Sequence, residues 1–194
     1  MTTQTTKALK RCCGSSVGII ITDEQDRLLM VERGWFPHGI APVAGHVYDE
    51  HTDVADALAA EVEEEVGLTV TSSERIGRGH IPNLCASLPA QPRPGHHWWL
   101  YRATATGALR PALGETKGAA WYTPREVRAL ADRTLAHARG EITQREFETD
   151  PGLEAVWVLL LHEAGLLQAC YEELVLARKL YTVAPDEYWL GGRP

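Results

Sequence analysis

The segment that most constrains this chain is an amphipathic stretch from Thr52 to Val66, which predicts a helix. Thr52 is a suitable N-cap, and Gly67 can end the helix in the left-handed conformation. Apolar residues recur at helical spacing along one side, so we expect this side to face a core. These residues are Val54, Ala55, Leu58, Ala59, Val62 and Val66.

The last two turns of this helix carry a cluster of glutamates. Positions i, i+3 and i+4 share a helix face, so Glu61, Glu64 and Glu65 lie together and Glu63 points away. A solvated acidic face is the simplest interpretation of such a run. However, carboxylates near a helix C-terminus oppose the macrodipole and repel one another. Glu65 also falls at the edge of the apolar stripe, a costly place for a lone carboxylate, so the cluster favours a function.

Three carboxylates on one face offer the oxygen ligands that hard divalent cations bind together with substrate phosphates. The sequence therefore predicts a site for Mg²⁺ or Mn²⁺. The same residues resemble the box of the Nudix hydrolase family, G-x5-E-x7-R-E-U-x-E-E-x-G-U, where U is aliphatic. Gly45 opens the box, and the second half is filled by Glu61, Val62, Glu64, Glu65, Gly67 and Leu68.

The first half of the box departs from the family pattern. Counting back from Glu61, the box Arg is Ala60 and the first box Glu is Thr52, with six residues between Gly45 and Thr52 instead of five. In the family these two residues mostly support the geometry of the loop and helix. Losing both opposite charges together leaves neither one unpaired, so the helix can tolerate the double change.

The resemblance implies an α/β/α sandwich with a mixed β-sheet, and hydrolysis of a diphosphate linkage in a small organic substrate. By the same resemblance, Glu61, Glu64 and Glu65 would hold the metal, and Glu64 and Glu65 would take part in catalysis. Some family members supply a further acidic residue from the loop before a strand that ends in Trp. Here that residue would be Glu115.

Other residues are candidates for substrate binding. Gly45 shapes the loop that begins the box, Arg33 could pair with phosphate, and Trp35 could stack on a base. In the strand pattern 96–106, alternation puts Trp98 on one face, and an exposed Trp there would suit a base or sugar. The simpler interpretations are a surface ion pair for Arg33, a loop anchor for Trp35 and core packing for Trp98.

The remaining pattern indicates strands before and after the box. Segments 17–22 and 27–32 predict a hairpin, and further strands are expected at 68–70, 75–80, 96–106 and through Trp121. Thr123 and Pro124 then predict the start of a helix. Beyond residue 134 the pattern is helical, and the segment 155–161 is apolar on all sides, which indicates burial.

We therefore divide the chain into a tail of residues 1–15, a Nudix domain of 16–133 and a helical C-terminal extension of 134–194. The extension is expected to cap the sheet or to form a homodimer contact.

Composition sets further limits. The net charge of −7 argues against a nucleic-acid partner. No apolar run has the length of a signal peptide or of a membrane span, so we expect a cytoplasmic protein without a membrane partner. The cysteines show no C-x-x-C spacing, so a zinc site is not expected. We expect reduced cysteines with a structural role. They are Cys12, Cys13, Cys85 and Cys170.

Two alternative functions remain open. The first is a non-catalytic Nudix-fold domain that binds a nucleotide as a sensor, which the substitutions at Thr52 and Ala60 favour and the intact glutamates disfavour. The second is a prenyl diphosphate isomerase of the same fold, which needs a catalytic Cys. Only Cys85 or Cys12 could be assigned to that role.

Overall fold

The computed structural model describes residues 10–49, 51–112, 114 and 116–189. The strands are β1 (Ser15–Ile21), β2 (Leu28–Arg33), β3 (Ile40–Ala41), β4 (Val43–His46), β5 (Thr69–Ile81), β6 (His96–Thr106) and β7 (Thr116–Tyr122). The helices are α1 (Val54–Val66), α2 (Pro124–Ala138), α3 (Gln144–Thr149), α4 (Ala155–Glu163) and α5 (Tyr171–Tyr181).

The strands form two sheets, which confirms the mixed α/β architecture. The larger has the order β4-β1-β6-β5, with β1 parallel to β6 and the other pairs antiparallel. The smaller is antiparallel, with the order β3-β2-β7. The predicted hairpin was wrong in one respect: β1 and β2 share only the bridge between Thr22 and Leu28 and then enter different sheets.

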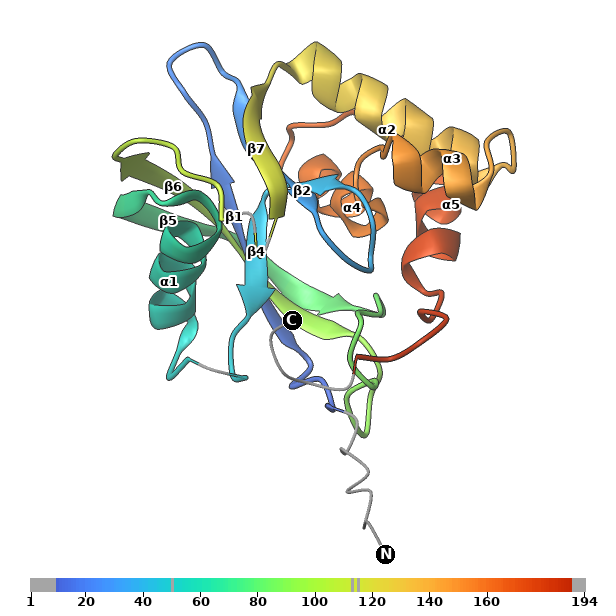
Figure 1. Ribbon diagram of the computed structural model, residues 1–194, viewed down its shortest axis with the longest axis horizontal. Coiled ribbons are helices and arrows are strands. Elements are labelled where there is room, and N and C mark those ends of the chain that lie inside the picture. Colours follow the sequence, from blue (N-terminus) through green and yellow to red (C-terminus); the bar gives the residue numbers. More distant parts are fainter. Residues whose placement is uncertain (1–9, 50, 113, 115, 190–194) are drawn as a thin grey trace, which may run out of the picture.

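Helices cover both faces of this strand layer, as Figure 1 shows with α1 at the left and α2 to α5 at the right. Strand β1 is buried along its whole length, so its alternating side chains must pack on both sides. Val17, Ile19 and Ile21 join the core beneath α1, whereas Ile20 joins the core beneath α2, α4 and α5.

Helix α4 fills the second of these cores. Its Trp157 is fully buried, with its ring against Gly18 of β1 and edge-on to Trp98 of β6 at 5.8 Å. The expected burial of this apolar segment is therefore confirmed, and the surface that it covers is the sheet. None of the helices in the described part of the chain has the length and apolar character needed to cross a membrane.

Several predicted boundaries shift. Asp53, and not Thr52, is the N-cap of α1, because its carboxylate accepts from the backbone N–H groups of Ala55 and Asp56. The two strands expected between residues 68 and 80 form the single strand β5, which has irregularities near Val70 and Arg75. The helix expected after Gly165 begins only at Tyr171. The capped start of α2 at Thr123 is confirmed by a complete capping box.

We expect the substitution Trp157→Ala to lower the free energy of unfolding by about 3 to 5 kcal/mol, because it opens a cavity between the sheet and α4. Urea denaturation measures this change. The control is Val175→Ala on the exposed side of α5, which should change stability by less than about 0.5 kcal/mol. Equal urea midpoints for Trp157→Ala and the wild type would contradict the assignment of α4 to the core.

Candidate functional site

The candidate site is built on the C-terminal half of α1. Gly67 ends the helix with a φ of 70°, and its N–H donates to the carbonyl of Glu63. Glu61 and Glu65 are half-buried, whereas Glu64 is exposed. The helix therefore extends through all three box glutamates, which share one face by their spacing.

Gly45 of β4 and Glu61 of α1 lie against each other. A Cβ atom built on Gly45 would lie 1.6 Å from Glu61 Oε1 and 1.9 Å from Glu61 Cδ, far inside van der Waals contact. Only a residue without a side chain leaves room for the carboxylate here. Gly45 pairs with Val17 of β1, so the Glu61 carboxylate is seated against the sheet.

The loop before α1 contributes a second group of contacts to this carboxylate. His51 Nε2 lies 3.6 Å from Glu61 Oε1, and His51 Nδ1 lies 3.9 Å from Asp56 Oδ2. Thr52 donates from its backbone N–H and its hydroxyl to the same Asp56 oxygen, at 3.0 and 3.3 Å. The residue aligned with the first box Glu therefore helps to hold the start of the helix.

The segment before β7 reaches the other end of α1. The backbone N–H groups of Arg110 and Ala112 donate to the carbonyls of Val66 and Glu65, at 2.8 and 3.1 Å. This places the beginning of the predicted loop beside the glutamates. Glu115 itself lies outside the residues that the structure describes.

Arg33 lies in an internal polar network. Its Nε donates to the carbonyl of Pro37 at 2.8 Å and lies 3.4 Å from Glu154 Oε2. Burial raises the pKa of the Glu154 carboxyl, while the Arg33 guanidinium and then His96 act in the opposite direction. Arg33 thus compensates an inward-facing carboxyl, and this ion pair is not the surface pair of the simpler interpretation.

The two tryptophans proposed for substrate binding differ in position. Trp35 is 46% exposed, so its ring is accessible. Trp98 is only 5% exposed, and its Nε1 donates to Asn83 Oδ1 at 3.0 Å. The expectation of an exposed Trp98 is therefore corrected: this ring packs in the core beneath α4, because its strand register turns it away from α1.

Trp99 is the aromatic residue that the sequence reasoning missed. It pairs with Val17, which pairs in turn with Gly45, so the three residues share the α1 side of the sheet. Tyr48, which is 55% exposed, meets the Trp99 ring edge-on at 6.1 Å. The alternation of side chains along β6 places Trp98 and Trp99 on opposite faces of the sheet. The strand pattern alone does not show which of these faces is turned toward the glutamates.

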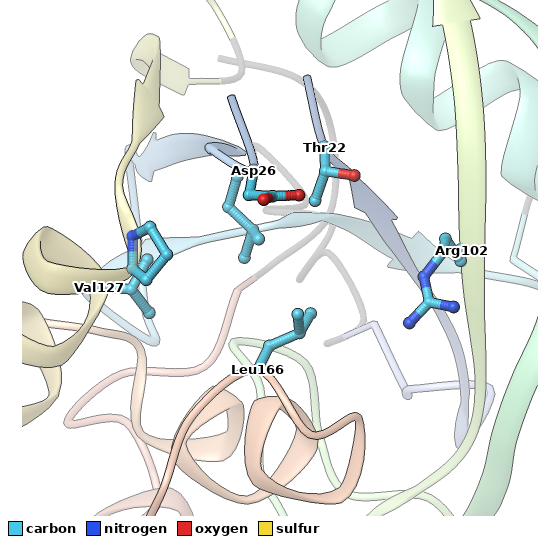
Figure 2. A pocket seen from close by; sticks show the side chains of 7 residues that line it. Thr22, Asp26, Arg102, Val127 and Leu166 are labelled. Atoms are coloured by element: carbon cyan, nitrogen blue, oxygen red, sulfur yellow. The ribbon is translucent and has the colours of Figure 1, made fainter. Parts of the chain in front are cut away.

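Two cavities among the described residues lie away from the box glutamates. The larger, about 290 Å³, lies beside α2, and Figure 2 shows Thr22, Asp26, Arg102, Val127 and Leu166 around it. The smaller, about 190 Å³, is lined by loop residues 36–38 and by parts of the C-terminal helices. The box glutamates lie on α1, where the Glu61 carboxylate rests against Gly45 of β4.

Comparisons with known structures give similar proteins of low sequence identity. A NUDIX-family hydrolase from Clostridium perfringens is 20% identical, with a TM-score of 0.46 over 60% of this chain and 85% of that one. The MutT protein from Methanosarcina mazei Go1 is 14% identical, with a TM-score of 0.47 over 62% and 83%. The NUDIX domain of Shewanella oneidensis NrtR, crystallised with ADP ribose, is 15% identical, with a TM-score of 0.46 over 66% and 80%.

No curated protein matches the chain. The model of the NUDIX domain family matches residues 14–145, which is more than half of the sequence and includes the whole box. The chain therefore belongs to the Nudix family.

Proposed function

We propose that this protein is a magnesium- or manganese-dependent hydrolase that cleaves a diphosphate linkage in a nucleoside diphosphate-type or related organic pyrophosphate. One observation carries the proposal: the Glu61 carboxylate is seated against Gly45, on the helix that also presents Glu64 and Glu65. Family membership supports a small-molecule substrate.

The donor set of this site fits a hard divalent cation. Glu61, Glu64 and Glu65 would hold it, because carboxylate oxygens are the ligands that Mg²⁺ and Mn²⁺ prefer. A bound cation would neutralise the negative charge that develops on the phosphoryl oxygens. The bare Cα of Gly45 lets the Glu61 carboxylate approach the strand, which limits the orientations of this ligand.

The remaining steps fall to the protein's own side chains. In our proposal, Glu65 or Glu115 accepts the proton of the water that attacks phosphorus. Trp35, Trp99 and Tyr48 offer aromatic surface for the organic part of the substrate, and the last two lie on the α1 side near Gly45. Arg33 acts indirectly, by holding Pro37 and Glu154 in place.

A nucleotide sensor without catalysis is the second candidate. It is favoured by Thr52 and Ala60, which replace the charged pair of the family box. The isomerase alternative has less support, because Cys12 and Cys85, the two cysteines open to that role, lie in one cluster with His46 and His96. Turnover of a panel of nucleoside triphosphates, dinucleotides, nucleotide sugars and prenyl diphosphates, with and without magnesium, separates these functions. A sensor would bind a member of the panel and release no product.

We expect Glu65→Gln to lower the rate of hydrolysis by roughly 10² or more, because it removes a preorganised charge from the site. The measurement is the initial rate of hydrolysis by the variant and the wild type at saturating magnesium. The wild type without magnesium serves as the metal-free reference. Thermal stability without magnesium should be unchanged or slightly higher, since one like-charge repulsion is lost. Wild-type turnover in Glu65→Gln would refute the assignment of this residue.

We expect Gly45→Ala to reduce hydrolysis by roughly 10²-fold while the protein remains folded. The new methyl group would overlap the Glu61 carboxylate. This carboxylate is the end of a flexible side chain and can move away, but it then no longer lies against Gly45. Gly79→Ala is the matched control, because no atom lies within 4 Å of a Cβ built on Gly79. Binding of Mn²⁺, followed by electron paramagnetic resonance, should weaken in Gly45→Ala only. Equal Mn²⁺ affinity in both variants would contradict this role of Gly45.

A further inference from the structure

Four potential metal ligands meet on the face of the sheet that is turned away from α1. They are Cys12 before β1, His46 at the end of β4, Cys85 in the β5–β6 loop and His96 at the start of β6. One donor atom from each lies within 4.8 Å of all the others. Cys12 and His96 are buried, and the other two are partly buried.

The spacing of these atoms matches a tetrahedral zinc site. With Zn–S near 2.3 Å and Zn–N near 2.0 to 2.1 Å, a tetrahedron separates sulfur from nitrogen by about 3.6 Å and two nitrogens by about 3.3 Å. Cys12 Sγ lies 3.5 Å from His46 Nε2 and 3.1 Å from His96 Nε2. The two Nε2 atoms are 3.3 Å apart.

The outer ring nitrogens of both histidines are held by acceptors. His46 Nδ1 lies 3.0 Å from Asp49 Oδ2, and His96 Nδ1 lies 3.0 Å from the Asn83 carbonyl. A carboxylate and a carbonyl can only accept, so both Nδ1 atoms carry hydrogen, and the Nε2 atom of each ring is directed at the Cys12 sulfur. Acceptors that hold the outer ring nitrogen in this way are typical of metal-binding histidines.

Further contacts support the ligands from outside. Lys10 Nζ lies 3.0 Å from Asp49 Oδ2, so the carboxylate that orients His46 is itself held. The backbone N–H of Gly14 donates to Cys12 Sγ at 3.2 Å, which stabilises a sulfur that carries negative charge. Asn83 Oδ1 also accepts from Trp98, which connects the cluster to the core beneath α4.

We propose that Cys12, His46, Cys85 and His96 bind a structural zinc ion, separate from the carboxylate site on α1. Two thiolates and two imidazoles fill a tetrahedron and leave no position open for substrate, which is the signature of a structural site. The ion would join the segment before β1 and the β5–β6 loop to the end of β4. This proposal does not depend on the hydrolase activity, because it concerns other residues on the other face of the sheet.

Metal analysis of the untagged full-length protein provides the first test. We expect about one zinc ion per chain by plasma mass spectrometry after gel filtration. The variants Cys12→Ser and His96→Gln should lose the zinc ion. Cys13→Ser should retain it, because the Cys13 thiol is hydrogen-bonded to the Ser15 hydroxyl and is not one of the four ligands. Glu65→Gln should also retain zinc, which distinguishes this site from the box. Full zinc in Cys12→Ser, or equal loss in Cys13→Ser, would overturn the proposal.

Substitution of the metal provides a second test, and its first part uses only the wild-type protein. Cobalt added to the wild-type protein should give the visible bands of tetrahedral Co²⁺ and a thiolate-to-cobalt charge-transfer band. Asp49→Asn should keep the same stoichiometry but lower zinc affinity by about 10- to 100-fold in competition with a chromophoric chelator. A disulfide between Cys12 and Cys85 in the isolated protein, or octahedral cobalt without the charge-transfer band, would refute the site.

Discussion

The structure depends on the burial of strand β1 on both faces. All seven residues from Ser15 to Ile21 are buried, and successive side chains point to opposite faces, so the strand needs cover on each side. Helix α1 supplies one cover and α4 supplies the other. Gly18 leaves the space into which the Trp157 ring fits. The C-terminal helices therefore close the second core of the sheet, which would expose an apolar face without them.

Strand β4 also directs its residues to both faces of the sheet, and it does so at the candidate site. Neighbouring residues of a strand point to opposite faces, so Gly45 faces Glu61 while His46 faces Cys12 and His96. The proposed zinc site and the carboxylate site therefore meet at consecutive residues of one strand. A tetrahedral centre at His46 would fix the end of β4 and, with it, the position of the Gly45 Cα against which Glu61 rests. The two sites differ in ligand chemistry but share their support.

Local patterns were enough to predict parts of this arrangement. The end of α1 at Gly67, the cap of α2 at Thr123 and the alternation of β6 all depend on neighbours in the sequence. The choice between Thr52 and Asp53 as N-cap could not be made locally, because both side chains suit the role. The burial of Trp98 depends on which face α4 covers. The Cys and His cluster was missed because its members come from distant segments without C-x-x-C spacing.

The changed half of the Nudix box can be understood from the contacts at the start of α1. The family pattern supports this region with a Glu and an Arg, which here are Thr52 and Ala60. Instead, Asp53 accepts from Ala55 and Asp56, and the Asp56 carboxylate accepts from Thr52. Capping of this kind contributes about 1 kcal/mol and fixes the first turn. His51 then links the loop to Glu61 at 3.6 Å. The start of α1 is therefore held by the Asp53 cap and by His51, both at positions adjacent to Thr52.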